Sequence, residues 1–270
     1  MTAVSFLCTV KNGGDLFMET LKSIRNQTFR DFELVVVDDG STDRTNERIR
    51  KFANENRFPV TLVTTKGVGR GRALNLGVEH CKGTYIMIVD DDDPIHPEKA
   101  RIQHEAGRSN PEYTVLCTRA FTLLNEDEPE WREISETGED PLDVTDRVYI
   151  KNPVIHSSVM IRKEALEAEG AYDETRKSQF DTELWLRLVT NGHRIGQIPY
   201  ALTAKRAHRN QAFERKKRLA FLTRTTALQL KYLKKAGVPP YYYVFPAAKF
   251  AYGLLPRAVR VQLRKSREQV

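Results

Sequence analysis

The sequence is poor in cysteine and has no long apolar run. Its 270 residues include three cysteines, an odd number with no CxxC pair. We expect small buried thiols in a reducing cytosol rather than a disulfide framework. No stretch approaches the ~18 uncharged apolar residues that a membrane-spanning helix needs. The first ten residues lack a basic segment and a cleavage pattern, so we expect no signal peptide.

Charge is distributed unevenly along the chain. The net charge is +7, but residues 205–270 contain 17 Lys and Arg against two acids, a balance of +15. Residues 1–204 contain 26 Lys and Arg against 34 acids, a balance of −8. At 40% hydrophobic residues the chain can form one large α/β domain or a domain with an appendage. A basic tail on an acidic body indicates a separate role against an anionic surface.

The first half alternates short β-rich runs with helical patterns. The pattern predicts strands at 4–10, 33–37, 60–63 and 85–89, and helices at 15–25, 45–54 and 70–80. This order implies an α/β fold with a mostly parallel sheet that helices cover on both faces. Such sheets bind ligands beyond the carboxyl ends of their strands. The residues after Val10, Val37 and Val89 are therefore the first candidates for a site.

The second half is less regular. Residues 125–149 are acidic and loop-like, and a helix is predicted at 181–191, ended by Gly192. A further helix is predicted from about Glu214 to Ala236, with Leu219, Leu222, Leu230 and Leu233 on one face. We place a catalytic domain at 1–208, with a nucleotide-binding part (1–95) and an acceptor part (96–208). Residues 209–270 form a helical, basic and aromatic tail.

Four adjacent carboxylates, Asp90 to Asp93, directly follow the fourth predicted strand. They repel one another, and a divalent cation would relieve the repulsion. Mg²⁺ or Mn²⁺ bound by one or two carboxylates and by phosphate oxygens is typical of sites where a nucleoside diphosphate leaves. A solvated acidic turn, helped by Pro94 and Pro97, is the alternative. The position at the ligand edge of the sheet favours the metal.

A second carboxylate pair, Asp38-Asp39, ends the second predicted strand before Gly40. A carboxylate here can accept hydrogen bonds from a base or a ribose hydroxyl. The alternative is an ordinary Asp-Gly turn with a helix cap formed by residues 41–43.

These motifs together resemble a known enzyme family. The stretch VSFLCTVKNGGDLFMETLKSIRNQTFRDFELVVVDDGSTDRT is similar to the opening of the inverting family-2 glycosyltransferases, which have the GT-A fold. GVGRGRALNLGVEHCKGTYIMIVDDDDPIHPEKARI resembles their next segment, which closes on D-x-D, and FDTELWLRL resembles the segment that carries their catalytic base. The three segments occur in the family's order and cover roughly the first 210 residues. The resemblance implies transfer of a sugar from a nucleotide-sugar donor to an acceptor hydroxyl.

The resemblance also implies roles for individual residues. Asp92 would hold the Mg²⁺ or Mn²⁺ that bridges the diphosphate, and Asp93 would help to orient the site. Lys11 stands where an aromatic commonly stacks on the base. The donor-binding positions implied are Thr9, Val10, Lys11, Asp39, Arg70, Arg72, Asp90 and Asp91. For the two arginines, a solvated helix start is the alternative.

Asp181 matches the catalytic base of the family. An attacking hydroxyl must lose its proton, and a carboxylate within hydrogen-bond reach can accept it. Asp181 also opens a predicted helix, so capping is the alternative role. Phe180 departs from the usual Glu or Gln. The resemblance places His156 and His208 as acceptor or diphosphate contacts, whereas a lone His at 156 is more often a packing or orienting residue.

The tail combines aromatic and basic residues. Tyr241 to Tyr243, Phe245, Phe250 and Tyr252 precede a run of arginines and Lys265. This composition favours binding of the tail to an anionic membrane surface. We therefore expect a cytoplasmic protein that is peripheral at the inner face of the cell membrane. Packing helices with solvated charges are the alternative. No nucleic-acid recognition motif accompanies the charge.

Two other functions remain open from the sequence. A sugar nucleotidyltransferase would share the parallel sheet, but it should carry an Arg-containing Gly-rich loop after the first strand, and CTVKNGG lacks the Arg. A non-catalytic homologue would bind only a nucleotide or a partner. The presence of both Asp92 and Asp181 argues against it. The expected acceptor is a glycan or a lipid-linked sugar in surface polysaccharide, lipid-linked oligosaccharide or glycoprotein synthesis.

Overall fold

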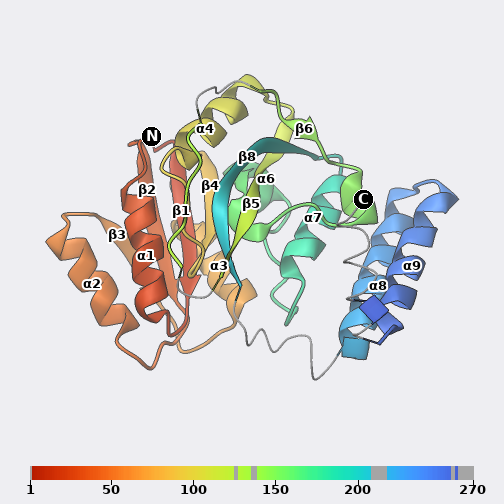
Figure 1. The fold of residues 1–270 in the computed structure, drawn as a ribbon, viewed down its shortest axis with the longest axis horizontal. Coiled ribbons are helices and arrows are strands. Elements are labelled where there is room, and N and C mark those ends of the chain that lie inside the picture. Colours follow the sequence, from red (N-terminus) through yellow and green to blue (C-terminus); the bar gives the residue numbers. More distant parts are fainter. Residues whose placement is uncertain (1, 125–126, 135–138, 208–217, 257–258, 261–270) are drawn as a thin grey trace.

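The computed structural model describes residues 2–124, 127–134, 139–207, 218–256 and 259–260. Their strands form one sheet in the order β3-β2-β1-β4-β7-β5-β8-β6, with helices on both faces (Figure 1). The predicted mostly parallel α/β fold is confirmed. The strands are β1 (Val4–Val10), β2 (Phe32–Asp38), β3 (Val60–Thr64), β4 (Tyr85–Asp90), β5 (Tyr113–Leu124), β6 (Leu142–Asp143), β7 (Met160–Arg162) and β8 (Arg194–Ala207).

The parallel half of the sheet consists of β1 to β4. β1 lies between β2 and β4 and is parallel to both, and β2 is parallel to β3. The cores of β1, β2 and β4 are buried on both faces, which is why they read as continuous apolar runs in the sequence. The ends of these strands place Val10, Asp38 and Asp90 at one edge.

The second half of the sheet contains the antiparallel strand β7 and continues the edge at which β1, β2 and β4 end. β7 is antiparallel to both β4 and β5, and β5 is parallel to β8. The start of β7 and the ends of β4, β5 and β8 therefore lie on the same side of the sheet. The short 3-10 helix His156–Ser158 precedes β7 and so reaches the Asp90 edge.

Two apolar clusters separate the helices by face. Helices α1, α2 and α4 contribute to one cluster, and α3, α5, α6, α7 and α8 contribute to the other. The helices are α1 (Gly14–Arg25), α2 (Thr45–Glu55), α3 (Arg70–His80), α4 (Lys99–Ser109), α5 (Arg147–Ile150), α6 (Lys163–Ala168), α7 (Phe180–Thr190), α8 (Arg218–Ala236) and α9 (Val244–Leu254). Trp185 of α7 is fully buried at the centre of the second cluster.

The four leucines predicted on one face of the helix ending at Ala236 do not form its buried face. Leu219 and Leu230 are exposed, and α8 instead buries Thr225, Leu228, Gln229, Tyr232 and Leu233. The cause is that α8 has two neighbours. It packs against α7 and the body through the buried stripe, while Leu222 fits against Gly253 of α9. The two helices form a hairpin beside α7 (Figure 1).

The cysteines and the lengths of the apolar helices can be compared with the expectations from the sequence. All three cysteines are buried and free, as predicted. Burial raises the pKa of Cys81 and of Cys117 to about 12, so both are unreactive thiols at neutral pH. Within the described part of the chain, no helix is both long and apolar enough to span a membrane.

Candidate active site

Asp90, the last residue of β4, is the centre of a polar cluster at the carboxyl edge. Arg70, at the start of α3, pairs with its Oδ1 atom. Nδ1 of His156 lies 3.5 Å from the same oxygen. Burial alone would raise the pKa of Asp90, but the charges of Arg70, His156 and Lys205 outweigh burial and lower that pKa. Asp90 is therefore a carboxylate at neutral pH.

Phe180 connects this cluster to the predicted base. Arg70 lies over its ring, 5.5 Å from the centroid, and the ring of His156 meets it edge-on at 5.7 Å. Tyr172 donates or accepts a 2.9 Å hydrogen bond at Nε2 of His156. Burial chiefly, together with the charges of Asp181 and Asp90, raises the pKa of Tyr172, so both carboxylates lie within electrostatic range of its hydroxyl.

Asp181 is the second residue of α7, and it is half-buried. Gln179 precedes the helix in the left-handed conformation, with φ of 60°, and makes no side-chain cap. The first-turn position is compatible with the capping alternative, because a carboxylate there stabilises the helix dipole. Asp181 directly follows Phe180, whose ring contacts Arg70 and His156 of the Asp90 cluster.

The remaining carboxylates of the run have different environments. Asp93 is buried, and it accepts hydrogen bonds from the Ser157 hydroxyl (2.6 Å) and the Arg206 backbone N–H (2.8 Å). Burial and the charge of Asp90 raise its pKa to about 7. Asp91 is partly exposed, and burial and the charge of Asp92 raise its pKa to about 6. Asp93 thus ties the carboxylate run to Ser157 and to Arg206 of β8, while Asp91 and Asp92 are partly exposed.

The carboxylate of Asp39 accepts hydrogen bonds from the loop between β3 and α3. The donors are the Thr65 hydroxyl (2.7 Å), the Val68 N–H (2.7 Å) and the Gly69 N–H (3.0 Å). Gly40, with φ of 77°, passes so close to Gly67 that an added Cβ would lie 2.7 Å from its nitrogen. Asp39 therefore shapes the turn that leads into Arg70 of α3.

Several predicted site residues lie elsewhere or have other partners. Arg72 pairs with Glu174 at 2.8 Å, away from Asp90, so the two arginines of the motif are not equivalent. Val10 is buried in the core, and its carbonyl accepts a hydrogen bond from the Asp39 N–H. Thr9 is half-buried and Lys11 is exposed at the same edge. His208 lies outside the described residues.

The sequence pattern did not identify two buried polar residues near the site. Tyr172 gives no local signal, because it becomes relevant only through the contact of its loop with His156. Arg206 at the end of β8 is fully buried, and it donates to the Asp92 carbonyl (3.2 Å), the Asp127 carbonyl (3.3 Å) and Glu19 (2.8 Å). No local pattern distinguishes it from the other basic residues that follow residue 204.

The donor set at this edge fits a hard divalent cation. Asp91 and Asp92 offer carboxylate oxygens, the ligand type that Mg²⁺ and Mn²⁺ prefer. Among the described residues, no three His, Cys, Asp or Glu side chains converge as a metal site. The protein would therefore supply one or two ligands, and phosphate oxygens and water would supply the rest, which is the common arrangement for Mg²⁺.

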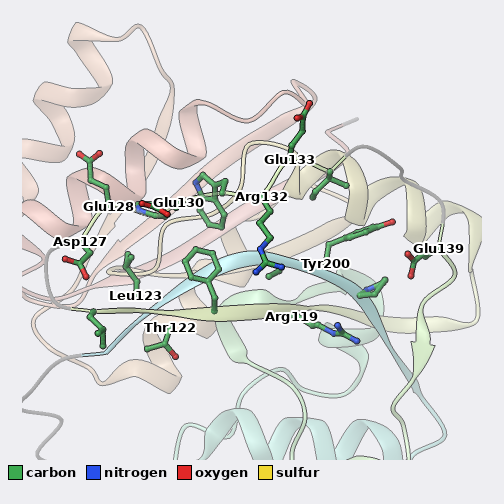
Figure 2. A pocket seen from close by; sticks show the side chains of 17 residues that line it. Arg119, Thr122, Leu123, Asp127, Glu128, Glu130, Arg132, Glu133, Glu139 and Tyr200 are labelled. Carbon is green, nitrogen blue, oxygen red and sulfur yellow. The ribbon is translucent and has the colours of Figure 1, made fainter. Parts of the chain in front are cut away.

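A pocket beside β5 and β8 is a separate feature, and it is larger than a second pocket, which lies beside α8. It has a volume of about 1470 Å³ and lies between β5, β8 and residues 127–134 (Figure 2). Its lining includes Tyr200 and the acidic side chains of Glu128, Glu130 and Glu133. None of the predicted site residues lines it. Size alone therefore does not identify the active site in this chain.

Comparisons with known proteins agree with the geometry. A family model described as glycosyl transferase family 2 matches residues 5–170. The chain belongs to glycosyltransferase family 2. It is 30% identical to the amylovoran biosynthesis glycosyltransferase AmsE of Erwinia amylovora over 200 residues. This alignment covers 70% of each chain. It is 25% identical to EpsE of Bacillus subtilis (strain 168) over 98% of this chain and 94% of that protein.

Solved structures of two other proteins share the fold. TarS of S. aureus in complex with UDP-GlcNAc superposes with a TM-score of 0.71 at 20% identity, covering 93% of this chain and 72% of that one. The mannosyltransferase PcManGT of Pyrobaculum calidifontis, in complex with GDP-Man and Mn²⁺, has a TM-score of 0.63 at 17% identity, covering 98% and 79%. The GT-A fold is thus confirmed, and the chain is a glycosyltransferase.

Proposed function

We propose that this family-2 glycosyltransferase transfers a sugar from a nucleoside-diphosphate sugar to an acceptor hydroxyl, with inversion at the anomeric carbon. The observation that carries the proposal is the contact of Phe180 with both Arg70 and His156. It joins the start of α7, where Asp181 lies, to the Asp90 cluster at the end of β4. A base on one side and a diphosphate site on the other are what a single in-line displacement requires.

The diphosphate side uses Asp92 and Arg70 in this proposal. Asp92, with Asp91 beside it, would hold Mg²⁺ or Mn²⁺, and the bound cation would supply charge stabilisation for the leaving diphosphate. Arg70 neutralises Asp90 and presents further guanidinium N–H groups toward the diphosphate. Support comes from the adjacency of Asp91 and Asp92 at the end of β4, where burial first and then the charge of Asp92 raise the pKa of Asp91, and a cation would counter both effects.

The acceptor side uses Asp181. Its carboxylate accepts the proton of the attacking hydroxyl as the diphosphate leaves. Phe180 makes the neighbouring wall apolar, which excludes water from one side of the base. His156, held by Tyr172, orients Asp90 and does not itself exchange protons with the substrates.

We also propose that the α8–α9 hairpin contacts an anionic membrane leaflet, at the inner face of the cell membrane. Lys249 is the one charged residue among the eleven of α9, and the exposed side chains include Val244 (63%), Leu254 (57%) and Tyr241 (60%). Arg218 of α8 donates to the Gly253 carbonyl of α9, next to Leu254. Aromatic and apolar groups next to Lys and Arg favour the membrane interface. This location suits a lipid-linked acceptor in the synthesis of a surface polysaccharide, a lipid-linked oligosaccharide or a glycoprotein glycan.

A panel of UDP- and GDP-sugars with Mn²⁺ tests the donor proposal. The expected result is slow release of nucleoside diphosphate from one donor, abolished by EDTA. A requirement for pyrophosphate would instead indicate a nucleotidyltransferase. Absence of binding and turnover with every donor would leave only a non-catalytic homologue and would contradict the proposal.

A further inference from the structure

A second, smaller pocket lies between the loop that precedes α7 and one face of α8. Its volume is about 550 Å³. Arg176, Lys177 and Ser178 line it from the loop, and Arg224 and Lys231 line it from α8. Arg224 and Lys231 are seven residues apart, two helical turns, so they project from the same face of α8. Its lining includes no carboxylate.

The protein only partly compensates the positive charge in this pocket. The hydrogen bonds of Thr175 chiefly, helped by the charge of Arg176, lower the pKa of Asp173. Lys231 lies 5.3 Å from the centre of the Tyr232 ring. Among the described residues, Arg176, Lys177, Arg224 and Lys231 form no ion pair. The Nε atom of Arg176 is buried and has no hydrogen-bond partner. A buried donor without a partner is costly, so it marks a position where an acceptor atom is expected.

The carboxylates near the pocket already have other partners. Asp173 accepts hydrogen bonds from the hydroxyl and the N–H of Thr175. Glu183 accepts from Arg187 and from the Tyr232 hydroxyl. An external anion would therefore meet four cations with little competition from the protein. A solvated basic surface is the ordinary explanation for such charges, but it does not account for the buried Nε of Arg176.

The pocket is held rigidly beside the proposed base. Gln179 Nε2 donates to the Thr225 hydroxyl, which ties the loop to α8 directly next to Arg224. The Tyr232 hydroxyl bonds Glu183 and fixes α8 against α7. Ser178 precedes Asp181 by three residues, so their Cα atoms are at most about 11 Å apart. A ligand in the pocket can therefore extend a short distance to reach Asp181.

We propose that this pocket binds a phosphate or diphosphate group of the acceptor. Arginine recognises phosphate oxygens with paired N–H donors, and lysine adds charge. Anchoring the phosphate here presents a hydroxyl of the attached sugar to Asp181. The inference rests on the proposed function, in which Asp181 is the base. It names the acceptor class as a phosphorylated sugar, either lipid-linked or free.

Lysine labelling read by mass spectrometry tests the site without donor, metal or transfer. The full chain is treated with an amine-reactive reagent in the presence of geranyl diphosphate, inorganic pyrophosphate or geraniol. Lys177 and Lys231 report on the pocket. Lys234, exposed on the same helix but outside the pocket lining, is the internal control. The expected result is that at least one diphosphate slows labelling of Lys177 and Lys231 several-fold, that geraniol does not, and that Lys234 is unaffected.

The two diphosphates separate the sources of the anion. Protection by geranyl diphosphate at lower concentration than by pyrophosphate supports a lipid-linked acceptor, and equal protection supports recognition of phosphate alone. Arg224→Gln should abolish the protection, whereas Lys234→Gln, with the same loss of charge, should retain it. Equal protection of Lys234, or equal loss of protection in both variants, would show a diffuse basic surface and overturn the proposal. Absence of protection by either diphosphate would also overturn it.

The result is independent of the proposed reaction. If Asp181 proved not to be the base, protection of Lys177 and Lys231 would still identify an anion site. If the pocket bound no anion, metal-dependent release of nucleoside diphosphate would still identify the donor chemistry.

Discussion

Arg70 pairs with Asp90 and at the same time lies 5.5 Å above the centre of the Phe180 ring. One guanidinium thus contacts the end of β4 and the start of α7. Its side chain remains 42% exposed, so it can also meet a ligand at this edge.

Arg70→Gln should weaken donor binding. It removes the main positive neighbour of Asp90, and a charge-assisted interaction of this kind contributes about 1.5–3 kcal/mol. We expect the donor KM to rise about tenfold or more. Arg72→Gln is the matched control, because Arg72 pairs with Glu174 instead. Comparable KM values for the two variants would contradict a specific role for Arg70.

Asp92→Ala should abolish transfer, and added Mg²⁺ or Mn²⁺ should not restore it. Asp92 is partly exposed within the carboxylate run, so the fold should survive the change. Activity is measured across a metal titration, and folding by circular dichroism. A folded variant that remains fully active in EDTA would show that the carboxylate run is only an acidic turn.

Lys99 should make stability depend on pH. It is fully buried, its Nζ donates to the Ser158 carbonyl at 3.0 Å, and burial lowers its pKa to about 7, against a small opposing effect of Cys117. Its pKa in the unfolded chain is about 10.4. Between these values the unfolded state binds more protons, so stability increases as pH rises from 7 and is lost as pH falls toward 7.

Lys99→Met provides the comparison. Relative to this variant, the free energy of unfolding of the parent protein should rise by roughly 1 kcal/mol per pH unit above pH 7. Urea denaturation at several pH values measures it, and Cys117 is present in both proteins. Parallel pH profiles would show that Lys99 keeps an ordinary pKa.

The exposed face of the α8–α9 hairpin should be needed for membrane contact. Replacing Tyr241, Val244 and Leu254 with Ser should reduce co-sedimentation with anionic vesicles and slow transfer to a lipid acceptor. Binding of the parent protein should weaken as salt rises, since electrostatic attraction is screened within about 8 Å at physiological ionic strength.

Leu142→Ser is the control for this prediction, because Leu142 is 48% exposed but lies on β6, away from the hairpin. Transfer to a soluble acceptor should be unchanged in all variants. Equal pelleting of the parent and the triple variant, or pelleting of neither, would assign the hairpin to packing or to an oligomer contact.

The sequence predicted best what is encoded locally. Long apolar runs such as those ending at Val10 and Val89 are strands because only a sheet buried on both faces accommodates them. Asp90 and Asp181 could be proposed as site residues because each belongs to a compact motif, and their roles stay predictions. The leucine face of α8 was wrong because the helix has two neighbours, and a single apolar stripe could not reveal which side each one covers.

Contacts between residues far apart in the sequence could not be predicted from local sequence patterns. The separation of Arg70 from Arg72 depends on Glu174, a hundred residues away. The burial of Arg206 depends on Glu19 and on the turn at Asp92. The carboxylate of Asp39 holds the turn before α3, since three donors from residues 65–69 surround it, and no sequence pattern indicated these contacts. The contact of Asp39 with a base stays a prediction.

Substitution of Asp181 by Asn tests the central claim most directly. The amide retains the shape of the side chain and can still accept a hydrogen bond at the start of α7, but it cannot accept the proton of the acceptor hydroxyl. Turnover should fall by about 10²–10⁴, with donor affinity and thermal stability largely unchanged. Near-normal turnover in the Asp181→Asn enzyme would show that Asp181 serves only the helix and would contradict the account.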